Sequence, residues 1–238
     1  MNCSGKYSGK YFSVVGDSIS TLEGYIPEGY ALYYDENNRR TANVHSPGDT
    51  WWGQVIDYFG GRLLVNNSWS GSTVSYHAEF TPGSFAQLDS RMSLLGRGGA
   101  APAVVMIYMG VNDWASGTKI SPEEGVPEEE SFEGSYRIML GKIKKYYPEA
   151  EIWCITPAVS SCSADPDFEF PYYLGGRHLS EYVETIRKVG RGEGCLVVDA
   201  NTCTEPVDAI DGIHPNAEGM KTLSRAIIER VNELIGGN

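Results

Sequence analysis

Residues 103–109 read AVVMIYM, an uninterrupted apolar run of strand length that is rich in Val and Met. A strand with no polar face is typical of a parallel sheet that helices cover on both sides. Four further short runs have the same character: Tyr11–Val15, Leu63–Asn67, Glu151–Ile155 and Leu196–Asp199. We therefore predict five parallel strands in one sheet.

Segments with apolar residues at helical spacing separate these strands. The predicted helices are Trp51–Phe59, Phe85–Leu95, Ser131–Tyr147, Leu179–Val189 and a last helix that ends at Leu234. The candidate N-caps are Asp49 or Thr50, Ser84 and Asn216, and Gly190 is expected to stop the fourth helix. The alternation predicts an α/β fold, a three-layer α/β/α sandwich that forms a single domain over residues 1–238.

The composition is that of an ordinary globular protein, with 41% hydrophobic and 21% charged residues. A formal net charge of -12 disfavours nucleic acid and anionic membranes as partners. No apolar run approaches membrane-spanning length, so we expect no integral membrane contact. The polar residues 1–10 predict a cytoplasmic protein, with secretion as the alternative if a signal peptide has been removed. The five cysteines suggest neither a disulfide framework nor a zinc site, and we expect no metal and no cofactor.

Two loops are unusually long, at residues 19–48 and 158–176. Both are rich in aromatic residues, which argues against disorder. Both follow the carboxyl ends of predicted strands, where doubly wound sheets bind their ligands. We therefore expect these insertions to shape a substrate site.

Two motifs contain residues suited to nucleophilic catalysis. Ser18 follows Gly16 and Asp17 directly after the first strand, which would hold its hydroxyl at the edge of the sheet. Taken alone, a Gly-Asp-Ser sequence is typical of an ordinary turn. Asp211 precedes His214 by three residues, just before the last helix, so its carboxylate can accept the Nδ1 proton and leave Nε2 to act as a base. A surface Asp–His hydrogen bond is the alternative for this second motif.

Two more motifs offer hydrogen-bond donors at the same predicted edge. Asn112 follows the third strand and can donate an amide N–H to a developing oxyanion. Gly71 follows the second strand and lets the backbone approach a ligand closely. Each motif could instead be a plain turn, but a parallel sheet brings all four to one edge, and together they form the set needed for acyl transfer.

With these four blocks in this order, the chain resembles the SGNH (GDSL) hydrolase family: Gly16-Asp17-Ser18, Gly71, Gly110-Val111-Asn112-Asp113 and Asp211-Gly212-Ile213-His214. The resemblance implies a flavodoxin-like fold with five central parallel strands. It also implies Ser18 as nucleophile, His214 as base and Asp211 as the residue that orients it. The implied oxyanion donors are the Ser18 N–H, the Gly71 N–H and the Asn112 side chain.

The predicted reaction is ester hydrolysis through an acyl-enzyme, with a small ester or an acylated carbohydrate as substrate. Removal of acetyl from a carbohydrate is the preferred activity. The alternatives are a short-chain carboxylesterase, a thioesterase, a lysophospholipase or, in another class, a non-catalytic carbohydrate-binding domain. The remaining predicted site residues are Asp17 and Asp113, as acceptors that brace the loops, and His45, Trp69 and Trp114, as substrate contacts. The sequence does not predict an oligomeric state.

Overall fold

The central sheet of the computed structural model, which describes residues 3–202 and 205–236, has five parallel strands in the order β2-β1-β3-β4-β8. The strands are β1 (Tyr11–Gly16), β2 (Arg62–Asn66), β3 (Val104–Tyr108), β4 (Glu151–Ile155) and β8 (Leu196–Val198). Gly16 is in register with Tyr108, and Tyr108 with Ile155, so three neighbouring strands end at the same level. The predicted five-stranded parallel sheet is confirmed.

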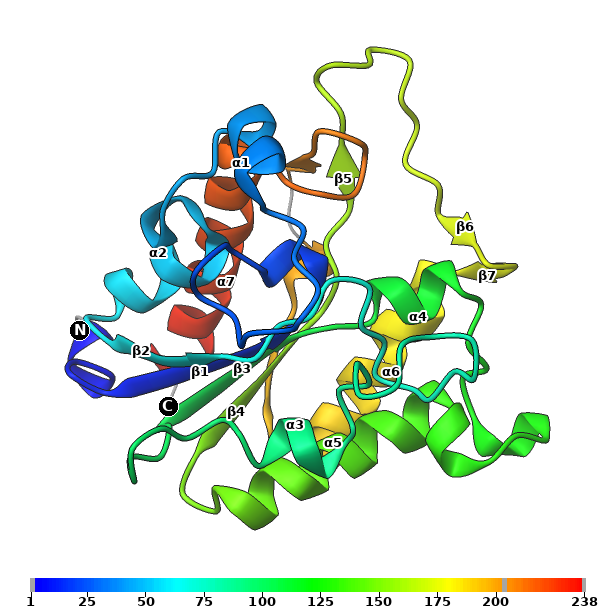
Figure 1. The fold of residues 1–238 in the computed structure, drawn as a ribbon, viewed down its shortest axis with the longest axis horizontal. Coiled ribbons are helices and arrows are strands. Elements are labelled where there is room, and N and C mark those ends of the chain that lie inside the picture. Colours follow the sequence, from blue (N-terminus) through cyan, green and yellow to red (C-terminus); the bar gives the residue numbers. More distant parts are fainter. Residues whose placement is uncertain (1–2, 203–204, 237–238) are drawn as a thin grey trace.

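Helices cover both faces of the sheet (Figure 1). Their bounds are α1 (Glu36–Ala42), α2 (Trp51–Tyr58), α3 (Asp89–Met92), α4 (Val111–Ala115), α5 (Phe132–Tyr146), α6 (Leu179–Gly192) and α7 (Ala217–Gly236). Val14 and Met106 point to the layer of α2 and α7, whereas Val15 and Ile107 point to the layer of α5 and α6. Because successive side chains of a strand alternate between faces, one apolar run supplies two cores.

Side chains cap three of the predicted helices, and two of these caps, Thr50 and Asn216, agree with the prediction. The Thr50 side chain accepts a hydrogen bond from Gly53 N at the start of α2. Ser131 caps α5 in the same way, and Asn216 Oδ1 accepts from Gly219 N, at 2.9 Å, at the start of α7. Each side chain satisfies a backbone donor that has no partner within its helix.

Two predictions about helix extent are wrong. Only Asp89–Met92 of the expected helix Phe85–Leu95 is helical, because Ala86 N donates to Thr73 O in the neighbouring loop and Ser84 O receives side-chain donors from elsewhere. Gly190 does not end α6, which continues to Gly192. A Cβ at Gly190 would lie 2.8 Å from Val197 Cγ2, so this glycine serves close packing of α6 on β8.

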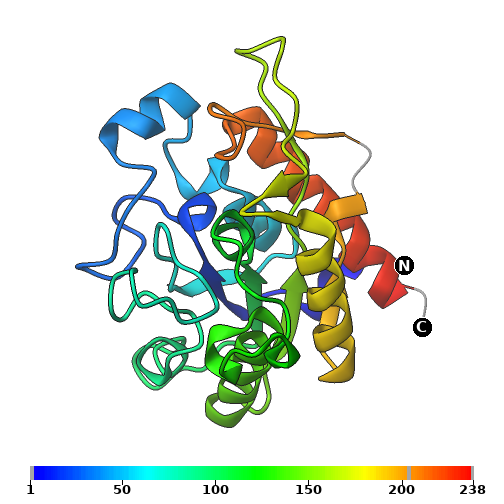
Figure 2. The same ribbon diagram turned by 90° about the vertical axis from the view of Figure 1, so that its right-hand side faces the viewer.

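The two long insertions contain short elements that the sequence did not reveal. Residues 19–48 include α1, and residues 158–176 include β5 (Ser160–Ser161) and β6 (Tyr173–Leu174). β5 pairs with β9 (Val207–Asp208), and β6 pairs with β7 (Arg177–His178). The segment between β5 and β6 projects from the body of the molecule, as Figure 2 shows. Short 3-10 turns complete the fold: Cys3–Lys6, Ser18–Ser20, Pro47–Asp49, Pro122–Glu124, Glu128–Glu130 and Ala200–Thr202.

Candidate active site

Ser18 lies in the tight turn after β1. A Cβ at Gly16 would lie 2.3 Å from Ser20 Oγ, so only glycine permits this close return of the chain. The Asp17 side chain caps the turn, since its Oδ1 accepts a hydrogen bond from Ile19 N at 3.0 Å. Ser18 itself is buried but for 7% of its surface, at the carboxyl end of the sheet.

His214 reaches Ser18 from the loop before α7. Its Nε2 lies 2.9 Å from Ser18 Oγ, and its Nδ1 lies 2.7 Å from Asp211 Oδ2. The other oxygen of Asp211 accepts hydrogen bonds from the backbone N–H groups of Ile213 and His214, at 3.0 and 2.8 Å. Serine hydroxyl, imidazole and carboxylate therefore form one hydrogen-bonded chain, with the carboxylate fixed by its own loop.

Two carboxyl groups near this chain have opposite pKa shifts. Partial burial raises the pKa of Asp211, but the hydrogen bonds from the His214 side chain and backbone outweigh it and hold the pKa well below its ordinary value. Complete burial raises the pKa of Asp17 to about 7, against the opposing hydrogen bond from Ile19. Asp17 Oδ2 is buried and has no hydrogen-bond partner among the described residues. Asp211 is thus suited to remain charged beside His214, whereas Asp17 is neutral over much of the acidic range.

The three predicted oxyanion donors lie in the segments that follow β1, β2 and β3. In the part of the chain that the structure describes, neither the Ser18 N–H nor the Gly71 N–H has a hydrogen-bond acceptor. Asn112 Nδ2 donates to Ser72 O at 2.9 Å, which leaves the second amide hydrogen for another acceptor. Trp69 N donates to Gly16 O at 3.1 Å and so holds the Gly71 turn, where φ is +79°, beside the serine turn. The predicted oxyanion donors therefore lie on adjoining loops.

Asp113 ties the loop after Gly71 to α4. Its two carboxylate oxygens accept hydrogen bonds from Val74 N and Ser75 N, at 2.9 and 3.1 Å. Burial raises the pKa of Asp113, although the hydrogen bonds from Val74 and Ser75 act against this. The carboxyl group fixes the spacing between the segment that carries Gly71 and the segment that carries Asn112.

A buried arginine that the sequence did not single out supports the Gly71 loop from below. Arg91 is 1% exposed, and its guanidinium donates to Asn67 Oδ1 at 3.0 Å and to Ser72 Oγ at 2.6 Å. It also donates to the carbonyl oxygens of Asn67 and Ser84. Two of the three residues that accept from it, Asn67 and Ser72, lie 24 and 19 positions earlier in the chain, so no local pattern pointed to it.

The three predicted substrate contacts lie in different places. Trp114 is buried, stacks on Phe170 with ring centroids 5.6 Å apart, and lines a cavity beside Ser18. Trp69 is half-buried and stacks on Tyr30, with centroids 4.2 Å apart. His45 is exposed, and its ring nitrogen contacts Asn43 at 3.1 Å; no contact brings it to Ser18 among the described residues.

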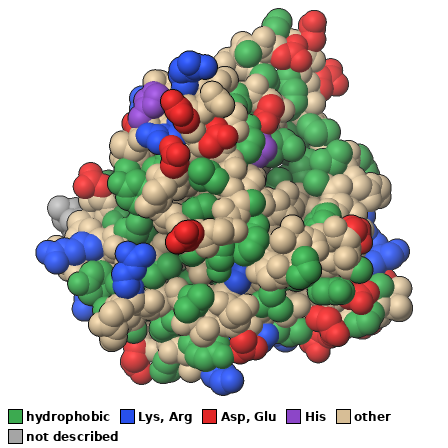
Figure 3. Space-filling view, viewed as in Figure 1, with side chains coloured by type: hydrophobic (Ala, Val, Ile, Leu, Met, Phe, Trp, Pro, Cys, Tyr) green, Lys and Arg blue, Asp and Glu red, His purple; other side chains and the backbone are tan. Residues whose placement is uncertain are grey.

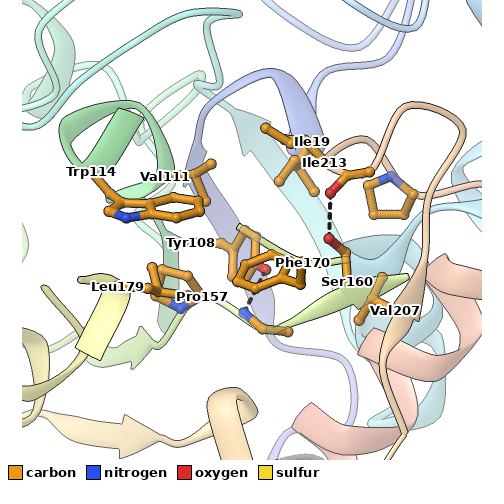
Figure 4. Close-up of a pocket in the computed structure, with 13 residues that line it drawn as sticks. Ile19, Tyr108, Val111, Trp114, Pro157, Ser160, Phe170, Leu179, Val207 and Ile213 are labelled. Atoms are coloured by element: carbon orange, nitrogen blue, oxygen red, sulfur yellow. Dashed lines mark hydrogen bonds between the residues drawn. The ribbon is translucent and has the colours of Figure 1, made fainter. Parts of the chain in front are cut away.

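Ile19, next to Ser18, and Ile213, next to His214, lie close together in the lining of this cavity (Figure 4). Its free volume is about 20 Å³, and its lining is mostly apolar. Trp114 and Val111 form one wall, and Phe170 lies across from Ile213. The Ser160 hydroxyl donates to Gly212 O and so ties the 158–176 insertion to the loop that carries His214.

The projecting insertion combines two kinds of surface. Figure 3 shows acidic side chains at the tip of the loop and hydrophobic side chains where the loop joins the body. Tyr172 and Tyr173 of this insertion are 50% and 71% exposed, and both contact the His178 ring. The centroid of the Tyr172 ring lies 5.2 Å from that of the Phe170 ring, so exposed aromatic rings continue outward from the stacked pair of Trp114 and Phe170.

The described residues contain no cluster of three or more His, Cys, Asp or Glu side chains suited to a metal ion. Within the same residues, no helix is long and apolar enough to cross a membrane.

Comparison with known proteins assigns the family. The family model for GDSL-like lipases and acylhydrolases matches residues 10–161, which is more than half of the chain. The chain belongs to this family. The matched residues include the Ser18 turn, Gly71 and Asn112. A triad and an oxyanion hole are typical of the family.

Solved structures with the same fold include a protein described as a GDSL-like lipase from Bacteroides ovatus ATCC 8483, with 24% identity and a TM-score of 0.71 over 97% of this chain and 100% of that chain. A carbohydrate acetylesterase from Sinorhizobium meliloti has 20% identity and a TM-score of 0.63 over 94% and 99%. An aryl esterase from M. smegmatis has 17% identity and a TM-score of 0.63 over 95% and 100%. No curated protein matches the sequence. At these identities the structures establish the fold of this chain, and the activities in their descriptions apply to those proteins.

Proposed function

We propose that this protein is a serine esterase that cleaves a carboxylic ester through an acyl-enzyme on Ser18. The observation that carries the proposal is the hydrogen-bonded chain from Ser18 Oγ through His214 to Asp211. A nucleophile, a base and a group that orients the base, each within hydrogen-bond reach of the next, are the requirements for acyl transfer. The membership in a family of lipases and acylhydrolases supports the same reaction class.

In the proposed first step, His214 Nε2 takes the Ser18 proton as Ser18 Oγ attacks the ester carbonyl. The negative charge that develops on the carbonyl oxygen is bound by the Ser18 N–H, the Gly71 N–H and Asn112 Nδ2. The imidazolium then protonates the leaving alcohol. In the second step, His214 activates water, which releases the acid and restores Ser18.

For the substrate, we propose a short acyl group carried by a carbohydrate. The mostly apolar cavity beside Ser18 has a free volume of only about 20 Å³, which suits a short acyl chain better than a long one. The exposed rings of Tyr172 and Tyr173 at its outer side suit stacking against a sugar. A short-chain carboxylesterase uses the same cavity without the sugar contacts, whereas a lysophospholipase or thioesterase needs room for a larger group.

The test has two parts. Fluorophosphonate labelling is expected to modify wild-type protein at Ser18 and to leave Ser18→Ala unlabelled, because the reagent needs an activated serine. Absence of label on the wild-type protein would instead support a non-catalytic binding domain. His214→Gln is expected to lose labelling as well, while the matched variant His77→Gln keeps it.

The second part is an ester panel, with Ser18→Ala as the blank. We expect p-nitrophenyl acetate to be hydrolysed faster than the octanoate, and acetylated oligosaccharides to release acetate. A preference for octanoate would contradict the short acyl group. Hydrolysis of simple acetates without any release from acetylated oligosaccharides would contradict the carbohydrate part of the proposal.

A further inference from the structure

Tyr33, from the first long insertion, contacts both members of the His214–Asp211 pair. Its ring stacks on the imidazole, with centroids 3.4 Å apart and an angle of 10° between the planes. Its hydroxyl donates to Asp211 Oδ2 at 2.9 Å, the same oxygen that faces His214 Nδ1. One side chain therefore covers a face of the imidazole and also shares its carboxylate partner.

The backbone around Tyr33 is anchored to the loops on either side of the site. Tyr33 N donates to Thr21 Oγ1 at 3.0 Å, and Thr21 Oγ1 donates to Ser18 O at 2.9 Å. The next residue, Tyr34, is buried, and its hydroxyl donates to Pro215 O at 2.7 Å. The insertion thus bridges the turn that carries Ser18 and the loop that carries His214.

We propose that Tyr33 is a positioning residue that fixes the plane of His214 and tunes its proton affinity through Asp211. The inference rests on the proposed function, in which His214 is the base. A hydroxyl that donates to a carboxylate disperses part of its negative charge, so the carboxylate stabilises the imidazolium less. The stacked ring opposes rotation of the imidazole away from Ser18 Oγ.

The environments of the other ionisable groups near His214 and Asp211 must stay the same if the effect of Tyr33 on His214 is to be measured. Asp17 attracts the charged form of His214 from the serine turn. Asp35 and Tyr34 lie on the same insertion as Tyr33 and interact electrostatically with it. Substitution of Tyr33 alone leaves these groups in place, so a change in the titration of His214 reports on Tyr33.

The decisive variant is Tyr33→Phe, which keeps the ring and removes the hydroxyl. We expect the His214 imidazole to hold its proton more tightly, because the carboxylate then bears its full charge. The acid limb of the kcat/KM profile should move to higher pH by about half a unit to one unit, with a loss of about three- to tenfold on that limb. Tyr33→Leu should lower kcat further at every pH, since it also removes the stacked ring.

The matched control is Tyr25→Phe, the same change in the same insertion, at a tyrosine that contacts Trp52 rather than the site. The pKa of His214 is measured by NMR, where the chain has only four histidines and the resonance lost in His214→Gln identifies the right one. A His214 titration in Tyr33→Phe that equals that of Tyr25→Phe would overturn the proposal. Hydrolysis that survives in Ser18→Ala would overturn the esterase mechanism instead, and the NMR titration still decides the role of Tyr33.

Discussion

The substitution Arg91→Met tests whether the buried guanidinium that supports the Gly71 loop affects kcat more than it affects the free energy of unfolding. Methionine keeps an unbranched side chain and removes the guanidinium, which donates to the side chain and carbonyl of Asn67, to Ser72 Oγ and to Ser84 O. In the variant, Ser84 O retains the Ser72 hydroxyl as a donor at 2.6 Å. The two Asn67 oxygens then lose their donors, and Ser72 Oγ loses one donor but keeps the hydrogen bond that it donates to Ser84 O.

The expected change in stability is small because two large terms oppose each other. Two buried acceptors without donors cost about 2–6 kcal/mol together. Burial lowers the pKa of Arg91 to about 10, and the difference from its ordinary value of about 12.5 corresponds to about 3 kcal/mol by which folding disfavours the charge. Removal of the charge recovers that amount. The free energy of unfolding should therefore fall by no more than about 3 kcal/mol.

The expected change in activity is larger. The guanidinium holds the segment that carries the Gly71 N–H and the Ser72 carbonyl, and that carbonyl in turn fixes Asn112. Since loss of one oxyanion donor costs about 10²–10³ in kcat, loosening of this segment should lower kcat about 10- to 100-fold. Urea denaturation and ester kinetics measure the two quantities, with the exposed Arg97→Met as the control. A wild-type kcat in Arg91→Met, or a loss of stability above about 5 kcal/mol, would refute this reasoning.

Two further substitutions test the neighbouring groups. Asn112→Ala should lower kcat about 10²–10³-fold with little change in KM, because it removes a donor used only in the transition state; equal kcat values in steady-state assays would exclude that role. The pKa of Asp17 is about 7 in the folded state, against an ordinary value of 3.8. The unfolded chain therefore releases this proton at a lower pH than the folded chain does. The free energy of unfolding should fall by up to about 4 kcal/mol as the pH rises from about 4 to 7. Asp17→Asn imitates the protonated carboxyl and should remove this slope from urea midpoints measured across that range; a slope that persists would assign it to another group.

The sheet was predictable because its strands are apolar on both faces, as in residues 103–109. Short apolar runs of this kind are typical of parallel strands that are covered on both faces. The meeting of Ser18 with His214 followed from the same sheet, since parallel strands bring their carboxyl ends to one edge. The expected helix Phe85–Leu95 failed because its backbone bonds with the Gly71 loop, a tertiary contact that outweighs local preference. The helical spacing of apolar residues does not reveal whether the backbone forms hydrogen bonds with a distant loop instead of within a helix.

Tyr33 and Arg91 could not be predicted for a related reason. Tyr33 contacts Asp211, 178 positions further along the chain, and Arg91 bonds with Asn67, 24 positions earlier. A tyrosine in an aromatic insertion and an arginine in a short helix look like many others. The roles of Tyr33 and Arg91 depend on where the fold places them. The insertion at residues 19–48, which was expected to shape the substrate site, also contacts the proposed base, His214.

The contact between Ser18 and His214 joins residues that are 196 positions apart, and this separation fixes the order in which the site can be built. Synthesis delivers the amino-terminal part of a chain first, so Ser18 leaves the ribosome long before His214 exists. The last helix must also dock, since α7 packs against α2 and Ser224 Oγ donates to Gln54. A ribosome-bound nascent chain stalled before residue 211 is therefore expected to resist fluorophosphonate, and labelling would mark the moment at which folding is complete.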